Sequence, residues 1–119
     1  MCSVLIVEDH SDTRRALATL LSRWGHTASA ADDVKSAISF IDEMSFDVIL
    51  SDIGLPDGNG YQFLAEIKKR RLEAKTAAVT ALSSAADLRA ANEAGFDHHF
   101  AKPLDLRRLQ SWLDLAAAV

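Results

Sequence analysis

Short apolar runs alternate with amphipathic helical segments five times along the chain. The apolar runs predict buried strands and cover residues 3–7, 27–30, 47–51, 77–80 and 98–101. The helical segments lie between residues 12 and 25, over 34–41, and at about 61–71, 84–94 and 105–117. Regular alternation of this kind favours a parallel sheet with right-handed crossovers and helices on both faces. We therefore expect an α/β fold, a doubly wound five-stranded parallel sheet in a (βα)5 three-layer sandwich.

Capping residues and apolar spacing refine this expectation. Asp12, Asp32 and Asp33 are expected to cap helices, because their carboxylates can accept hydrogen bonds from free backbone N–H groups. Gly25 and Gly95 are expected to end helices. The side chains expected to pack inward are Leu17, Leu20, Leu21, Trp24, Val34, Ala37, Ile38, Ile41, Leu64, Ile67, Phe100, Leu106, Leu109, Leu113 and one edge of Trp112.

The composition narrows the class of protein. The chain has 119 residues with 13 basic and 17 acidic side chains, and a net charge of −4 argues against direct nucleic-acid binding. No linker or repeat interrupts the pattern, so residues 1–119 are expected to form a single domain. The single cysteine, Cys2, gives no internal disulfide, and the first apolar run is too short for a membrane span. We therefore expect a cytoplasmic domain without membrane contact.

Polar residues stand where the expected strands end. Glu8 and Asp9 follow the first strand, Asp52 follows the third, Thr80 closes the fourth, and Lys102 follows the fifth. The carboxyl ends of parallel strands meet at one edge, which is where open α/β sheets bind ligands. Three carboxylates, a hydroxyl and an ammonium group are therefore expected in one crevice.

This set of groups suits phosphoryl chemistry. Three crowded carboxylates repel one another and should raise at least one pKa unless a cation shares the site. Mg²⁺ would relieve this repulsion, since it prefers one or two carboxylates with water and phosphate. Together with Lys102, Thr80 and the backbone N–H groups around Gly54, it could neutralise a phosphoryl group. The central candidate for the nucleophile is Asp52, in the glycine-rich segment 46–60.

Across essentially the whole chain, these residues resemble the flavodoxin-like receiver domain of two-component response regulators. The matching segments are Glu8-Asp9, Asp52–Gly60, Val79-Thr80-Ala81 and Lys102-Pro103. Each pair alone is a weak signal, but all four occur in this order at the ends of the expected strands. The segment Gly95–Pro103 looks more like receivers attached to hybrid sensor histidine kinases.

The resemblance implies a phosphorelay function. Asp52 would accept a phosphoryl group from a sensor histidine kinase, a histidine phosphotransfer protein or a small donor such as acetyl phosphate. Mg²⁺ would be held by Asp9, Asp52 and the backbone carbonyl of Gly54, with Glu8 reaching it through water. Such a domain catalyses its own phosphorylation and dephosphorylation and is not a classical enzyme. Histidine kinase activity would belong only to a longer, hybrid chain.

The resemblance also assigns contacts to the phosphoryl group. Lys102 would pair with it, and the backbone N–H groups of Ile53, Gly54 and Ala81 would donate to it. The peptide bond before Pro103 is expected to be cis. The partner is expected to dock on the first helix, although its three arginines, Arg14, Arg15 and Arg23, could equally be solvated surface residues.

A switch from Thr80 to an output face is the remaining implication. Thr80 would move toward the phosphoryl group, and the face formed by residues 84–94, 98–101 and 105–117 would change shape for a downstream partner or an attached domain. The alanine-rich helix 84–94 has few large anchors, which is compatible with such a shift. His99 replaces the aromatic residue usual in the family; it is either a switch whose charge is pH-sensitive or an exposed residue without that role.

Gly54 and Leu82 stand where many receivers have polar side chains that orient the hydrolytic water. Neither residue can do so, and we expect slow loss of the phosphoryl group. A haloacid-dehalogenase-like phosphatase would need a second Asp in place of Gly54. A flavodoxin-like or dinucleotide-binding module would place its anionic cofactor against Glu8-Asp9. A phosphorylation-silent interaction module with the same fold stays an alternative, and so does either a stand-alone receiver or a fragment of a longer protein.

Overall fold

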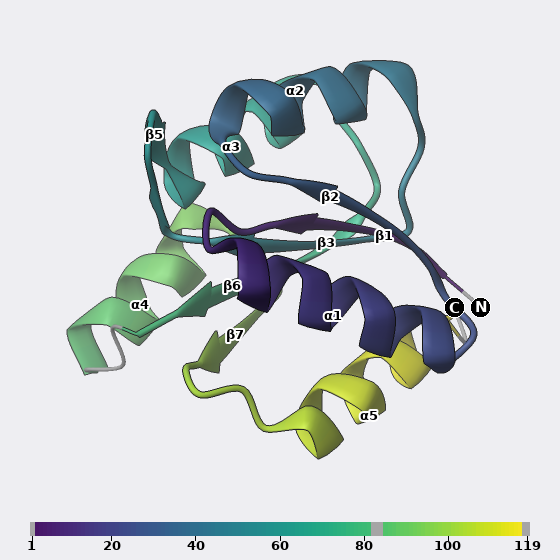
Figure 1. The fold of residues 1–119 in the computed structure, drawn as a ribbon. Helices are drawn as coiled ribbons and strands as arrows, with labels where there is room; N and C mark the ends of the chain where they lie inside the picture. The colour runs from purple at the N-terminus through teal and green to yellow at the C-terminus, as the bar shows by residue number, and fades with distance from the viewer. Residues whose placement is uncertain (1, 82–84, 118–119) are drawn as a thin grey trace.

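Five parallel strands form one sheet in the order β2-β1-β3-β6-β7 (Figure 1). The structure is a computed structural model that describes residues 2–81 and 85–117. The strands of this sheet are β1 (Ser3–Val7), β2 (Thr27–Ala31), β3 (Val48–Asp52), β6 (Lys75–Thr80) and β7 (His98–Ala101). All four neighbouring pairs are parallel. The expected five-stranded, doubly wound sheet is therefore confirmed.

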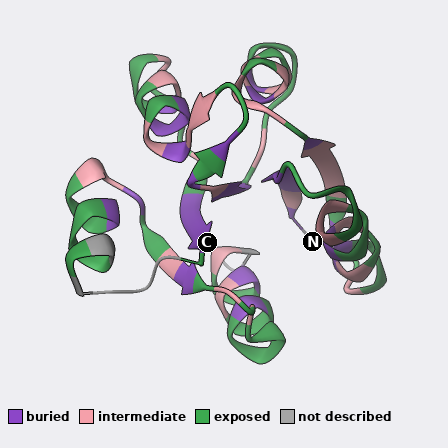
Figure 2. Ribbon diagram, turned by 60° about the vertical axis from the view of Figure 1, so that its left-hand side comes forward, coloured by how far each residue is buried: buried purple, intermediate pink, exposed green. Residues whose placement is uncertain are grey.

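Helices cover both faces of the sheet. The helices are α1 (Ser11–Arg23), α2 (Val34–Glu43), α3 (Gly60–Lys69), α4 (Ala85–Ala94) and α5 (Leu106–Ala117). One core cluster joins the sheet to α1 and α5, and a second joins it to α2, α3 and α4. Buried residues accordingly concentrate in the central strands and on the inner sides of the helices (Figure 2). The result is the three-layer arrangement that the alternating pattern predicts.

Strand alternation decides on which face the site opens. In β1, Leu5 and Val7 belong to the core beneath α2 and α3, whereas Val4 and Ile6 belong to the core beneath α1 and α5. Since successive side chains alternate between faces, Glu8 continues on the α1 and α5 side. The backbone supports this register, because the N–H of Glu8 donates to Ala31 O at 3.0 Å in the neighbouring strand.

The helix starts differ in part from the expectation. His10, not Asp12, caps α1, and its Nδ1 accepts a hydrogen bond from Thr13 N at 3.3 Å. Because the helix already begins at the residue before it, Asp12 lies in the first turn, where its charge favours the helix dipole. Asp33 caps α2 as expected and accepts from Ser36 N at 2.7 Å.

The ends of α1 and α4 agree with the expectation, whereas Asp32 and Leu106 differ from it. Gly25 and Gly95 have φ angles of +90° and +108° just after α1 and α4, which suits glycine. Among the described residues, Asp32 accepts a hydrogen bond from the Ser36 hydroxyl, at 3.4 Å, and none from a backbone N–H group, so it does not cap the helix there. The expectation that Leu106 is buried was wrong: as the first residue of α5 it is 46% exposed.

The glycine-rich segment after β3 contains more structure than the expected loop. The strands β4 (Gly54–Leu55) and β5 (Gly58–Asn59) pair as a short antiparallel hairpin. Helix α3 starts directly after it, at Gly60, with a capping box between Asn59 and Gln62. The glycine-rich segment therefore forms a tight hairpin that leads directly into a helix.

Gly60 permits a close backbone approach at the base of this hairpin. Its N–H donates to Ile53 O at 2.7 Å. A Cβ atom at this position would lie 2.5 Å from the backbone oxygen of Asp52. Any larger residue would push α3 away from the end of β3.

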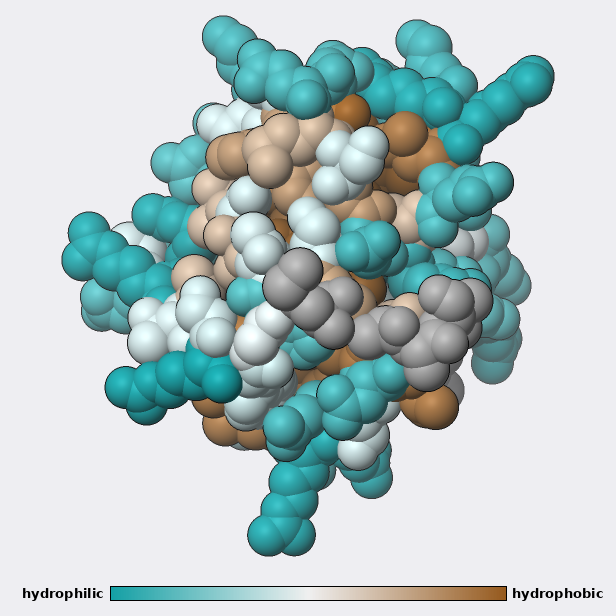
Figure 3. All heavy atoms as spheres, turned by 90° about the vertical axis from the view of Figure 1, so that its right-hand side faces the viewer, coloured by the Kyte–Doolittle hydropathy of each residue, from teal (hydrophilic) through white to brown (hydrophobic). Residues whose placement is uncertain are grey.

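The face at the amino ends of the strands, seen in Figure 3, mixes hydrophilic side chains with smaller apolar areas. Met44 and Leu72 are among the exposed apolar residues, and with Phe46 they line a cavity of about 400 Å³ before β3 and β6. Within the described parts of the chain, no helix is long and apolar enough to cross a membrane.

Candidate phosphoryl-transfer site

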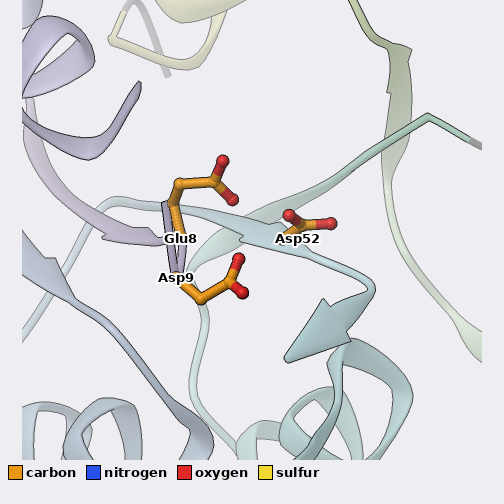
Figure 4. A group of neighbouring side chains, drawn as sticks. All are labelled: Glu8, Asp9 and Asp52. Atoms are coloured by element: carbon orange, nitrogen blue, oxygen red, sulfur yellow. The ribbon is translucent and has the colours of Figure 1, made fainter. Parts of the chain in front are cut away.

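The carboxylates of Glu8, Asp9 and Asp52 gather at the carboxyl edge of the sheet. Glu8 and Asp9 follow β1, and Asp52 is the last residue of the neighbouring strand β3 (Figure 4). One carboxylate oxygen from each residue lies within 4.8 Å of the other two. Glu8 is buried, Asp52 is half-buried and Asp9 is exposed, so the group opens from the core toward solvent.

Lys102 connects two of these carboxylates. Its Nζ donates to Asp52 Oδ2 at 2.9 Å and to Glu8 Oε1 at 3.0 Å. Lys102 follows β7 at the far side of the sheet, and the Lys102–Pro103 peptide bond is cis. A single ammonium group therefore bridges the ends of β1 and β3 from a strand that is adjacent to neither.

The electrostatics reflect a shortage of positive charge. Burial and a hydrogen bond with Asp52 raise the pKa of Glu8 from about 4.5 to about 7, although Lys102 acts in the opposite direction. Burial alone would lower the pKa of Lys102, but its hydrogen bonds to Asp52 and Glu8 outweigh that effect and raise it. The site therefore holds a charged lysine, and Glu8 keeps its proton up to about pH 7.

The donor set fits a hard divalent cation. Glu8 Oε2 is buried and has no hydrogen-bond partner among the described residues. An unpaired carboxylate oxygen in the interior is costly, and a cation or cation-bound water would satisfy it. Mg²⁺ prefers oxygen ligands from one or two carboxylates together with water. Glu8, Asp9 and Asp52 present that chemistry within 4.8 Å.

The other residues expected at the site lie at the carboxyl ends of β3 and β6. Thr80 is buried at the end of β6, and its carbonyl accepts a hydrogen bond from Lys102 N at 2.9 Å. Ile53 is buried directly after β3, whereas Gly54 at the start of β4 is exposed. Ala81 follows Thr80 and is exposed. The backbone of these positions thus follows β3, which carries the acceptor candidate, and the neighbouring strand β6.

The family model of the response regulator receiver domain matches residues 4–114. The chain belongs to this family. It is a receiver domain of two-component signalling, a system in which receivers accept phosphoryl groups from histidine kinases.

Relatives of this receiver include two kinds of larger protein. The sensor histidine kinase RcsC of Salmonella typhi is 31% identical over 114 residues, which are 96% of this chain and 12% of that kinase. The KDP operon transcriptional regulatory protein KdpE of Escherichia coli is 33% identical over 116 residues, 98% of this chain and 51% of that regulator. The chain thus spans about an eighth of the length of RcsC and about half of the length of KdpE.

Solved receiver structures share the fold. The receiver domain of the Francisella response regulator 1452 superposes with a TM-score of 0.92 at 22% identity, covering 98% of this chain and 96% of that one. The response regulator TrrA of Thermotoga maritima, solved in complex with Mg²⁺ and BeF, has a TM-score of 0.85 at 25% identity, covering 98% and 99%.

His99 of this receiver is half-buried, not exposed. It lies on β7, and its Nε2 is buried without a hydrogen-bond partner among the described residues. His98 lies beside Phe100 and stacks on Trp112 of α5, with ring centroids 5.8 Å apart. Strand alternation directs His99 to the opposite face. Its switching role stays a prediction.

Two residues near the receiver's site were not anticipated in their structural roles. Arg14 Nη1 donates to the carbonyl of Glu8 at 3.0 Å and to that of Asp9 at 3.4 Å, so it holds the backbone of the acidic pair. The sequence could have indicated this contact, because Arg14 lies in the first helical turn after the acidic pair. Asp57, between β4 and β5, binds the start of α2. No local pattern indicates that contact, because the partner lies 23 residues away.

A cavity of about 730 Å³ opens beside the site, between α1 and the segment that follows β7. Glu8, Asp52 and Lys102 border it, and its floor is apolar. Arg15 and Arg23 of α1 also line it. The acceptor candidate is therefore reachable along an apolar groove with cationic side chains on one wall.

The raised pKa of Glu8 predicts a pH-dependent stability. The folded, metal-free protein keeps a proton on Glu8 between about pH 4.5 and 7, which the unfolded chain has released. Unfolding therefore becomes easier as the pH rises through this range, by at most about 1.4 kcal/mol per pH unit. Urea unfolding at several pH values without divalent ions measures this slope. Glu8→Gln should flatten it, and an unchanged slope in that variant would contradict the assignment.

Proposed function

We propose that this receiver accepts a phosphoryl group on Asp52 in a phosphorelay. The observation that carries the proposal is the bridge of Lys102 Nζ to Asp52 and Glu8, beside Asp9 in the same acidic group. It offers a carboxylate nucleophile, a fixed cation and oxygen ligands for a metal at one strand edge. Positioning and charge neutralisation are what phosphoryl transfer requires most.

In the proposed transfer, an oxygen of Asp52 attacks the phosphorus atom of a phosphohistidine. A phosphorus–oxygen bond forms while the phosphorus–nitrogen bond breaks, and the electron pair stays with the imidazole. The ring leaves neutral when its second nitrogen carries a proton. Lys102, already 2.9 Å from Asp52, pairs with the transferred oxygens. Backbone N–H groups of Ile53, Gly54 and Ala81 donate to them.

Mg²⁺ is the proposed cofactor. Asp9, Asp52 and the Gly54 carbonyl would hold it, with Glu8 acting through water, and the buried unpaired oxygen of Glu8 supports that assignment. When bound, it neutralises charge on the phosphoryl oxygens. The complex of TrrA with Mg²⁺ and BeF adds support by similarity.

The proposed output is a rearrangement from Thr80 toward the face formed by α4, β7 and α5. Thr80 moves toward the phosphoryl group, and the side chain of His99 changes its degree of burial. The sparse anchoring of α4 supports this direction: Ala91 is 1% exposed, whereas Leu88 is 44% exposed. A downstream protein or an attached domain would recognise the altered face.

The proposed phosphodonor is a sensor histidine kinase or a histidine phosphotransfer protein in the cytoplasm. The groove beside α1 supports this choice, since it joins cationic Arg15 and Arg23 to the acceptor. Arg14 is already engaged with backbone carbonyls, which makes it the least available of the three arginines. The similarity to RcsC supports a receiver from a hybrid kinase, and that to KdpE a receiver from a regulator.

Asp52→Asn tests the acceptor directly. Incubation of the wild type with acetyl phosphate and Mg²⁺ should add one phosphoryl group to the intact mass, and both the variant and an EDTA control should show none. An adduct that persists in the variant would overturn Asp52 as the acceptor. No adduct from acetyl phosphate or from a phosphohistidine donor, with the fold intact, would identify a phosphorylation-silent interaction module.

Gly54→Asn tests the expectation of slow phosphoryl loss. A Cβ at Gly54 would meet nothing within 4 Å, so a side chain fits there without distortion. A carboxamide could orient the attacking water, and we expect the lifetime of the adduct to fall several-fold. Gly54→Ala is the control and should leave the lifetime unchanged. Equal lifetimes in all three proteins would contradict the expectation, whose second position, Leu82, lies outside the described residues.

Arg15→Ala tests the proposed docking groove. Arg15 lines the groove, whereas the exposed Arg107 on α5 does not, which makes Arg107→Ala the matched control. We expect Arg15→Ala to slow transfer from a phosphohistidine protein and to leave phosphorylation by acetyl phosphate unchanged. A loss with both donors, or an equal loss in the control variant, would count against docking here.

A further inference from the structure

A single side chain ties the hairpin after the acceptor strand to helix α2. Asp57 Oδ1 accepts a hydrogen bond from Val34 N at 2.8 Å, and Oδ2 accepts one from Lys35 N at 3.1 Å. These N–H groups have no partner within the helix, because they belong to its first turn. Asp33 takes the next one, that of Ser36, at 2.7 Å. Two carboxylates therefore share one helix start, but only Asp57 comes from another part of the chain.

The sequence also removes the obstacle to this contact. A Cβ at Gly58 would lie 3.3 Å from Val34 Cγ2 and would collide with the side chain of Gln62. The absence of that atom lets the hairpin approach α2 closely. The hydrogen bond from Val34 N is the first cause of the lowered pKa of Asp57, so the carboxylate stays charged at neutral pH. Its negative charge also interacts favourably with the positive end of the α2 dipole.

Asp57 is not the hairpin's only restraint, since the capping box between Asn59 and Gln62 ties β5 to α3. Each strand of the hairpin is two residues long. Leu55 is buried in the core, and the bond from Gly60 N to Ile53 O closes the base. Gly54 is exposed and has no side chain of its own to pack. The direction of its backbone groups therefore depends on how the rest of the hairpin is held.

We infer that Asp57 is a positioning residue for the phosphoacceptor site. By fixing the hairpin on α2, it sets the direction in which the Gly54 carbonyl faces the metal and the Gly54 N–H faces the phosphoryl group. The inference rests on the function proposed above for Asp52 and Mg²⁺. It assigns to an exposed residue outside the acidic group a share in how firmly the metal is held.

Asp57→Ala and Asp33→Ala form a matched pair for the test. Each removes one carboxylate from the start of α2, so both should lower stability toward urea to a similar degree. Only Asp57→Ala releases the hairpin. In metal-free protein, hydrogen exchange at the Gly60 amide should become faster in Asp57→Ala and stay at the wild-type rate in Asp33→Ala. Asp57→Asn, which keeps one acceptor oxygen, should fall between the wild type and Asp57→Ala.

Calorimetric titration with Mg²⁺ alone gives the second readout. We expect Asp57→Ala to weaken Mg²⁺ binding about tenfold, as loss of a supporting contact around a metal typically does. Asp33→Ala should bind Mg²⁺ like the wild type. Equal affinities in all variants, or equal losses in both alanine variants, would overturn the inference. If the wild type itself binds no Mg²⁺, the proposed metal function fails, whereas Gly60 exchange still decides whether Asp57 holds the hairpin.

Discussion

The ion pairs of Lys102 with Glu8 and Asp52 hold the site together. Three carboxylates within 4.8 Å of one another would otherwise repel, and the ammonium group of Lys102 reaches them from the opposite half of the sheet. The pairs are only partly exposed, so solvent and salt screen them less than surface pairs. Their geometry requires that β1, β3 and β7 all end at the same edge, which a parallel sheet guarantees.

The core makes this edge rigid at its centre and softer toward one side. β1 and β3 lie between two apolar clusters, so the acidic residues at their ends rest on a fixed base. Helix α4 is less firmly attached, since Leu88 is 44% exposed. Elements with few buried apolar contacts open at low cost. The structure therefore combines a firmly packed acidic group with a neighbouring helix that has a large exposed apolar side chain, as the proposed output requires.

The parallel sheet and its acidic edge could be predicted because they follow from periodicity and from the rule that the carboxyl ends of parallel strands share one edge. Local features for which the sequence allows several structures could not be predicted. His10 caps α1 in place of Asp12, since the cap depends on where the first turn begins. The hairpin of β4 and β5 lies in a glycine-rich segment without alternating apolar residues. The contact of Asp57 with Val34 is tertiary and leaves no local signal.

In the proposed phosphorelay, charge links chemistry at Asp52 to the proposed output face. A phosphoryl group brings about two negative charges and three acceptor oxygens to the site. Lys102 already serves Asp52 and Glu8, so it cannot satisfy these oxygens alone. The proposed further donors are a cation, backbone N–H groups and Thr80 at the end of β6. Because Thr80 pairs in register with Ala101 of β7 and precedes α4, recruiting its hydroxyl in the proposed switch would act on the side of the sheet next to α4.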